Sequence, residues 1–290
     1  MAYFLISVSN KTNLELCIKY ALAGFTNSIN GVWTFLELQE GDFLSFLYGA
    51  KAFNLYKVEN KESIREANKI GPWPSVTFRM SGRTYYFPFR IFLTPIREFT
   101  EPMVKQEFAY VAENLLLRGG YRRTHFQADQ TTLQAVSQMG EPYKNSIIGF
   151  KENYKVFVPL FTFTSRILNL PEIFHFQECI LQALIRHWLS QTKNLQQIFT
   201  YLGLNSFSAT DEVKMGSLQK KDIEQLQKYM DELGEECEKG ILIGKEVSKK
   251  IIEEAKNKKI QCFLYSFKNL DLEKQYAFNE LLSNLQIKIC

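Results

Sequence analysis

Apolar positions in the first 140 residues follow two different periods. Short runs rich in aromatic and β-branched residues, bounded by Gly, Asp or Ser turns, predict strands at Tyr3–Val8, Phe43–Tyr48, Val76–Met80 and Thr84–Leu93. Spacings of three and four residues predict helices at Asn13–Ala23, Met103–Arg118 and, more briefly, Asp129–Met139. Several short strands with few helices indicate a small β-barrel.

The pattern changes after residue 140. Residues 140–154 are rich in Gly, Pro, Asn and Lys and read as a linker, which gives domains 1–145 and 146–290. Strand-like and helical runs alternate beyond it, which predicts an α/β core in the second domain and an α+β protein overall. The expected helices are Pro171–Lys193, Leu218–Leu233, a helix ending near Lys258, and Leu270–Leu285; the expected strands are Gln197–Leu202, Phe207–Met215, Gly240–Gly244 and Ile260–Phe267.

Composition narrows the class of protein. The chain has 290 residues, of which 46% are hydrophobic and 23% charged, as in ordinary globular proteins. No apolar run approaches the ~20 residues of a membrane-spanning helix, and the N-terminus lacks a signal-peptide core. The five cysteines form no C-x-x-C pair. We therefore expect a cytoplasmic protein without membrane contact, disulfides or a zinc site.

The net charge of +4 by itself indicates no polyanionic partner, but arginine is unevenly distributed. Arginine's planar fork suits phosphates and base edges. Eight arginines precede residue 140, at positions 65, 79, 83, 90, 97, 118, 122 and 123. The arginine-rich half is therefore a candidate nucleic-acid surface, with a solvated charged face as the alternative.

Two tryptophans and several amides recur in the first domain. They are Ser9-Asn10 with Asn13, then Gly31-Val32-Trp33, then Pro72-Trp73-Pro74. A flat base is recognised by aromatic faces on either side and by amides that bond its edge. These residues predict a pocket for a flipped or single-stranded base, unless both tryptophans are ordinary core residues.

The first 100 residues resemble the PUA-like superfamily, and within it the YTH and EVE domains, in the order YFLISVSN, GVW, FLSFLYG, NLYKVEN, PW and FPFRIFL. The resemblance implies that Trp33 and Trp73 form a cage around a methylated base such as N6-methyladenine. It implies that Asn13, with Ser9 or Asn10, bonds the edge of the base. Ser7-Val8-Ser9-Asn10 replaces the Lys-Ser-Asn-Asn of the YTH family.

A basic and aromatic segment, Tyr121–Phe126, follows a Gly-Gly pair. Its Arg122 and Arg123, together with Arg90, are the candidate contacts to a phosphate backbone. An ordinary solvated turn is the alternative.

The second domain carries a carboxylate and an ammonium at the end of a strand-like run, in Asp211-Glu212-Val213-Lys214. Strand alternation places Glu212 and Lys214 on one side. Such a pair suits metal-dependent phosphodiester hydrolysis, although a surface salt bridge has the same pattern. On the next helix, Gln225 and Tyr229 are four residues apart and share a face.

The second domain contains, in order, Glu-x-Lys, Q-x-x-x-Y, the run GILIG, a helix and a last strand. This order resembles that of the PD-(D/E)xK nucleases, most closely the NucS and RecB-like endonucleases. The resemblance implies a restriction-endonuclease-like fold that uses Mg²⁺ or Mn²⁺. It makes Glu212 a metal ligand, Lys214 the catalytic lysine, Gln225 and Tyr229 a supporting pair, and Glu178 an accessory metal ligand.

One family residue is missing. The family has an Asp on the strand before Glu-x-Lys, and here Thr200 falls at about that place, with no acidic residue between Glu178 and Asp211. The sequence therefore supports two hypotheses. The first is a modification-dependent DNA endonuclease that acts as a homodimer. The second is a non-catalytic reader of modified RNA or DNA whose degenerate nuclease-like domain serves for dimerisation.

Overall fold

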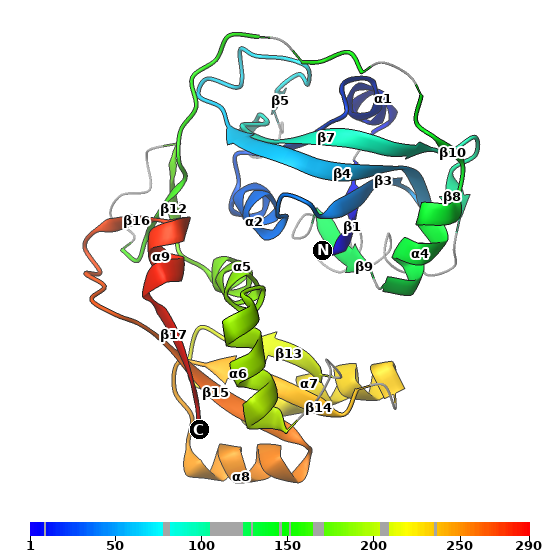
Figure 1. The fold of residues 1–290 in the computed structure, drawn as a ribbon. Coiled ribbons are helices and arrows are strands. Elements are labelled where there is room, and N and C mark those ends of the chain that lie inside the picture. The colour runs from blue at the N-terminus through cyan, green and yellow to red at the C-terminus, as the bar shows by residue number, and fades with distance from the viewer. Residues whose placement is uncertain are drawn as a thin grey trace. The chain divides into compact units, whose positions relative to one another are not determined.

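A computed structural model describes residues 1–8, 10–77, 82–104, 124–128, 130–144, 147–150, 152–164, 171–203, 209–234 and 237–290. The chain divides into two compact units, Met1–Pro159 and Leu160–Cys290, and both mix helices with strands (Figure 1). The sequence predicted a boundary at residue 145. The later boundary has a physical cause, because Tyr154 donates a hydrogen bond to Glu62 and the Phe157 amide donates to the Ser63 carbonyl.

The first unit is mainly β-structure. Its helices are α1 (Lys11–Tyr20), α2 (Ile29–Glu37) and α4 (Gln130–Gln138). Its strands are β1 (Tyr3–Ser7), β2 (Leu22–Phe25), β3 (Phe43–Tyr48), β4 (Lys51–Ser63), β5 (Val76–Thr77), β6 (Thr84–Tyr85), β7 (Phe89–Glu98), β8 (Met103–Val104), β9 (His125–Ala128) and β10 (Glu141–Pro142).

Eight of these strands form one sheet in the order β10-β7-β4-β3-β1-β9, with β2 paired to β7 and β8 paired to β4. The pair β1–β3 is parallel, and the other pairs in the sheet are antiparallel. Among the described strands this sheet does not close on itself. The barrel that the sequence predicted is therefore not found in the described part of the unit, where the sheet has edges at β10 and β9.

Strand alternation gives this sheet two apolar faces. Tyr3 and Leu5 of β1 pack into a cluster that includes Val136 of α4. Phe4, between them, points to the opposite face and lies 5.9 Å, ring to ring, from His125. His125 also contacts Trp33 of α2, so α2 and α4 cover different faces of the sheet.

The second unit has two sheets. Its helices are α5 (Glu178–Leu189), α6 (Thr192–Leu202), α7 (Lys220–Leu233), α8 (Lys249–Asn257) and α9 (Phe278–Asn284). Its strands are β11 (Leu160–Thr162), β12 (Ile173–His175), β13 (Ala209–Val213), β14 (Lys239–Gly244), β15 (Ile260–Phe267), β16 (Gln275–Ala277) and β17 (Leu285–Ile289). A small sheet has the order β12-β11-β16, and the main sheet has the order β13-β14-β15-β17.

The main sheet of the second unit lies between helices. Strands β13, β14 and β15 are parallel, and β17 is antiparallel to β15. Helices α7 and α8 pack on one face, where Leu226 and Ala255 share a cluster with Cys262. Phe263, the next residue of β15, contacts Tyr201 of α6, which places α6 on the opposite face. This layering matches the α/β core that the sequence predicted.

Several predicted elements differ from the structure. The predicted helix Pro171–Lys193 is shorter, because β12 precedes α5 and α6 begins at Thr192, and the predicted strand Thr84–Leu93 is divided into β6 and β7. Gln197–Leu202 belongs to helix α6 and not to a strand, because Ile198 and Leu202 are buried at helical spacing and Gly203 ends the helix in the left-handed region (φ 66°). The predicted helix Leu270–Leu285 is shorter, with β16 before α9 and β17 after it. Most of the predicted helix 103–118 lies outside the described residues.

Within the described ranges, we find no helix that is both long and apolar enough to cross a membrane.

Candidate functional site

The candidate active site lies at the carboxyl end of the parallel strands in the second unit. Strand β13 ends at Val213, and the Lys214 amide continues the ladder by donating to the Ile243 carbonyl of β14 (2.8 Å). Glu212 and Lys214 point to the same side, with 2.7 Å between Lys214 Nζ and Glu212 Oε1. This contact agrees with the strand alternation seen in the sequence. In α/β sheets, ligands bind at this edge.

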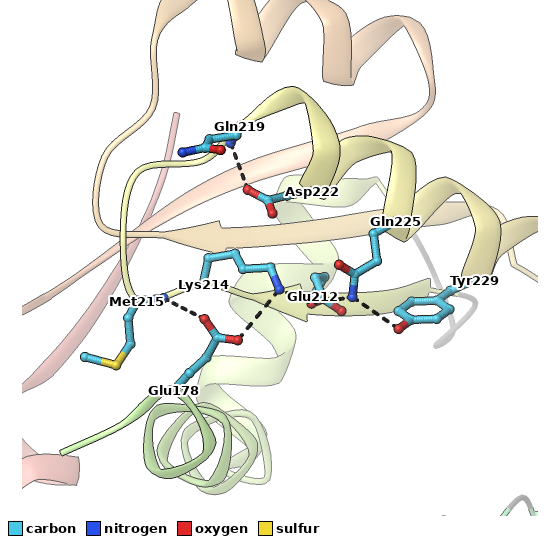
Figure 2. A network of polar contacts seen from close by, with 8 residues as sticks. All are labelled: Glu178, Glu212, Lys214, Met215, Gln219, Asp222, Gln225 and Tyr229. Atoms are coloured by element: carbon cyan, nitrogen blue, oxygen red, sulfur yellow. Dashed lines mark hydrogen bonds and ion pairs between the residues drawn. The ribbon is translucent and has the colours of Figure 1, made fainter. Parts of the chain in front are cut away.

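Helix α7 supplies the second part of the site. Ile223 and Leu226 are fully buried against the sheet, which fixes the rotation of the helix. Gln225 therefore reaches Glu212, and its Nε2 donates to Glu212 Oε1 (3.0 Å) and to the Tyr229 hydroxyl (3.2 Å). Figure 2 shows this chain of contacts from Tyr229 to Lys214.

Helix α5 supplies the third part through Glu178 in its first turn. Glu178 Oε1 lies 3.7 Å from Lys214 Nζ, and Glu178 Oε2 accepts a hydrogen bond from the Met215 amide (3.3 Å). The N-terminal end of a helix stabilises a nearby carboxylate. Lys214 consequently lies between two carboxylates that come from different elements (Figure 2).

The site has an excess of negative charge. Partial burial by itself lowers the pKa of Lys214, but the hydrogen bond and charge of Glu212, with the charges of Glu178 and Asp222, outweigh it and raise that pKa above its ordinary value. The two carboxylates paired with one ammonium leave a formal charge of −2 + 1 = −1, and the more distant charge of Asp222 adds to it. Lys214 is thus a protonated donor at neutral pH, in a setting that attracts cations.

This raised pKa gives a pH-dependent stability. Because the folded pKa of Lys214 exceeds the unfolded value of about 10.5, its ion pairs stabilise the fold fully below pH 10.5, and the effect is lost as the pH rises through the folded pKa. We expect Lys214→Met to lower the free energy of unfolding by roughly 1–3 kcal/mol at pH 8. Urea titrations of both proteins from pH 8 to 11.5 should show the difference shrinking above pH 10.5. A difference independent of pH contradicts this account.

The oxygen set at this site fits a divalent cation such as Mg²⁺. Mg²⁺ is usually held by one or two carboxylates plus substrate phosphates, and Glu178 and Glu212 supply two. The described residues contain no cluster of three His, Cys, Asp or Glu side chains suited to a metal. Both carboxylates contact Lys214, so an ion bound by Glu178 and Glu212 would take the position of the ammonium between them. Oxygens of the substrate would complete the ligands of the ion.

Thr200 does not occupy the place that the sequence assigned to it. It lies on helix α6, is exposed, and donates its hydroxyl to the Gln196 carbonyl within that helix. The comparison with a strand Asp was wrong, because the segment is helical. Glu178 is the carboxylate that the structure brings to Lys214.

The sequence analysis missed two side chains of this site. Asp222 is buried and closes a capping box at the start of α7 by accepting from the Gln219 amide (2.9 Å). Asp222 lies three residues after the N-cap residue Gln219, and this capping-box spacing could have identified it in the sequence. Tyr265 donates to the Met215 carbonyl (2.7 Å), and burial, with the charge of Glu178, raises the pKa of Tyr265 to about 12. No local motif signals Tyr265, because it acts across the sheet.

The two tryptophans predicted to cage a base are buried in the first unit and have different neighbours. Trp33 is 7% exposed, donates its Nε1 to Glu37 (3.1 Å) and lies 4.8 Å, ring to ring, from His125. Trp73 is 6% exposed and packs on the backbone at Gly24, where a Cβ would lie 2.4 Å from its ring. Each ring is held by its own contacts.

The predicted edge-binding amides lie at the start of α1. The Asn10 side chain accepts from the Asn13 amide (2.8 Å) and caps that helix. Asn13 is buried at 8% exposure. Ser9 lies outside the described residues. The Asn10 side-chain oxygen thus already has a structural role.

Of the arginines predicted to contact a phosphate backbone, only Arg90 is described; Arg122 and Arg123 lie outside the described residues. Arg90 is 1% exposed and donates to the carbonyls of Ile70 (2.9 Å) and Phe87 (3.4 Å). That position does not fit the prediction, because a backbone contact requires a guanidinium that faces solvent.

Comparison with known proteins adds little to this geometry. No protein-family model and no curated protein matches the chain. An NMR structure of Rpa0253 from Rhodopseudomonas palustris aligns with 48% of this chain and 93% of its own, at 14% sequence identity and a TM-score of 0.25. That similarity is too weak to indicate a shared fold.

Proposed function

We propose that the protein is a divalent-cation-dependent DNA endonuclease that cuts DNA carrying a methylated base. The observation that supports it most is the meeting of Glu178, Glu212 and Lys214 at the carboxyl end of the parallel strands, with Gln225 bonded to Glu212. These are the residues to which the resemblance to PD-(D/E)xK nucleases assigns a role in catalysis. Three separate elements bring them together.

Each residue has a distinct role in the proposed reaction. Glu178 and Glu212 would hold the cation, and Gln225 and Tyr229 fix the orientation of Glu212. The Lys214 ammonium is available to stabilise the negative charge that develops on the phosphate. When bound, Mg²⁺ or Mn²⁺ would polarise the phosphate and supply an activated water.

The first unit is the proposed reader of the methylated base. Trp33 and Trp73 are its proposed contacts to a flipped base, and binding would have to uncover their rings, because each is less than 8% exposed. A homodimer, which would present one active site to each DNA strand, is part of the proposal.

The test uses one plasmid prepared with N6-methyladenine, with 5-methylcytosine, or with neither. We expect Mg²⁺ to permit cutting of one modified plasmid and not of the unmodified one. Binding of modified DNA without cutting under Mg²⁺ or Mn²⁺ would overturn the endonuclease proposal.

A second candidate function is a reader of modified RNA or DNA without catalysis. It is favoured by the pairing of Lys214 with both carboxylates and by the lack, among the described side chains, of a third metal ligand beside them. In that case the second unit serves for dimerisation, and wild-type protein and Glu212→Gln should bind modified DNA equally without cutting it.

A further inference from the structure

The turn after β13 carries Lys214 into the candidate active site. The Lys214 amide at its start donates to the Ile243 carbonyl of β14 (2.8 Å). The Gly216 carbonyl at its end accepts from the Lys245 amide, just after β14 (3.0 Å). Met215 lies between these two residues and is held by side chains instead. The position of Met215 therefore depends on the side chains that surround the turn.

Two side chains from different elements bond Met215. The Tyr265 hydroxyl, on β15, donates to the Met215 carbonyl (2.7 Å). The Met215 amide in turn donates to Glu178 Oε2, on α5 (3.3 Å), as Figure 2 shows. Met215 thus connects Tyr265 to one of the two carboxylates that would hold the cation.

Tyr265 is a firm support for this turn. The order β13-β14-β15-β17 places its strand between two others, and its side chain is 7% exposed. Its ring lies 6.0 Å from the ring of Phe267. Phe263, two residues before Tyr265 and so on the same face of the sheet, contacts Tyr201 of α6. A side chain locked by packing on a rigid strand holds its hydroxyl in one place.

The two hydrogen bonds of Met215 differ in strength. The bond from Tyr265 has the usual length for a hydroxyl donor and is partly buried, whereas the bond to Glu178, at 3.3 Å, is at the long end of the range for an amide. A small displacement of Met215 would break the longer bond. The orientation of Glu178 is therefore sensitive to what holds Met215.

We propose that Tyr265 is a positioning residue of the cation site: it fixes Met215, and Met215 directs the Glu178 carboxylate toward the cation. The proposal rests on the proposed cation-dependent function and adds a residue to it. Tyr265 itself contacts neither the substrate nor the cation. Groups that bond a metal ligand set the ligand's orientation, and their loss commonly costs 10–100-fold in metal affinity.

Each carboxylate then has its own support. Gln225 and Tyr229, on α7, orient Glu212. Tyr265 orients Glu178 from the face of the sheet opposite α7, on which α6 packs. The two carboxylates would thus be aligned independently, from the two faces of one sheet.

The test is the affinity for Mn²⁺, measured by calorimetric titration without DNA. Tyr265→Phe keeps the ring and removes the hydroxyl, so we expect it to weaken Mn²⁺ binding by about tenfold. Tyr201→Phe is the matched control, because it removes a hydroxyl that accepts from Gln197 (3.2 Å) and leaves Met215 untouched. It should bind Mn²⁺ nearly as wild type does.

A double-mutant cycle separates positioning from a general effect on the fold. If Tyr265 acts through Glu178, then Tyr265→Phe should cause no further loss of Mn²⁺ affinity in a Glu178→Gln protein. Hydrogen exchange of the Met215 amide, followed by NMR with isotope-labelled methionine, gives a readout that needs no cation. We expect it to be slow in wild type and faster in Tyr265→Phe.

Equal Mn²⁺ affinity of wild type and Tyr265→Phe, or the same loss with and without Glu178→Gln, would overturn the proposal. Should Tyr265→Phe fail to fold, fast exchange of the Met215 amide in wild type overturns it. Cutting of DNA with Mn²⁺ affinity unaffected by Tyr265→Phe refutes this role alone. The expected loss of affinity without any cutting refutes the nuclease alone, and no Mn²⁺ binding by wild type refutes both.

Discussion

Lys214→Met should lower the rate of DNA cleavage by about 10²–10³-fold while it strengthens the binding of divalent cations. The loss of rate follows from removing a preorganised donor near the reacting phosphate. The gain in cation affinity follows from freeing Glu178 and Glu212, which both pair with Lys214 at 3.7 and 2.7 Å. Single-turnover cleavage and calorimetric titration with Mn²⁺ measure the two effects.

A lower cleavage rate together with a higher cation affinity distinguishes a catalytic Lys214 from one that forms only a structural salt bridge. If Lys214 only stabilised the fold, its removal would lower thermal stability and leave the cleavage rate of the folded fraction unchanged. Tyr229→Phe is a matched control at the edge of the same network, because it removes one hydroxyl that accepts from Gln225. It should lower the rate severalfold and leave Mn²⁺ affinity nearly unchanged. Equal Mn²⁺ affinity in wild type and Lys214→Met contradicts the competition.

Gly31→Ala should destabilise the first unit by about 3 kcal/mol or more. A Cβ at Gly31 would lie 1.8 Å from the Thr26 carbonyl oxygen, which belongs to the backbone and cannot rotate away. The first turn of α2 would have to shift, and Trp33 with it. For a unit of this size, the melting temperature should fall by roughly 6–12 °C.

Gly216→Ala is the matched control, because no atom lies within 4 Å of the position of its added Cβ. Calorimetric melting should place it within about 0.5 kcal/mol of wild type. If Gly31→Ala melts like Gly216→Ala, the start of α2 is not packed against Thr26 as described here.

The candidate active site was accessible from the sequence because its residues follow local periodicities. Glu212 and Lys214 share a side of a strand, and Gln225 and Tyr229 share a side of a helix, so the spacing alone pairs them. Glu178 was reached only through the resemblance to a nuclease family. Asp222 acts through a helix cap, and Tyr265 acts across the sheet, so neither shows in a search for catalytic motifs.

The errors have a common physical origin in tertiary context. Gln197–Leu202 has the β-branched and aromatic residues of a strand, yet burial of Ile198 and Leu202 on one face makes it a helix. Arg90 looked like a surface contact because arginine is usually exposed. Its burial between Trp73 and Phe150 depends on residues distant in sequence, which no local pattern shows.

The central claim is that Glu178, Glu212 and Lys214 form a cation-dependent site for cutting DNA. The most direct measurement incubates supercoiled plasmids carrying N6-methyladenine or 5-methylcytosine with wild-type protein in Mg²⁺, in Mn²⁺ and in EDTA, beside Glu212→Gln. The account predicts linear product with wild type in either cation, none in EDTA, and at least about 10²-fold slower cutting by Glu212→Gln. Equal cutting by wild type and Glu212→Gln, or no cutting by wild type in either cation, would contradict it.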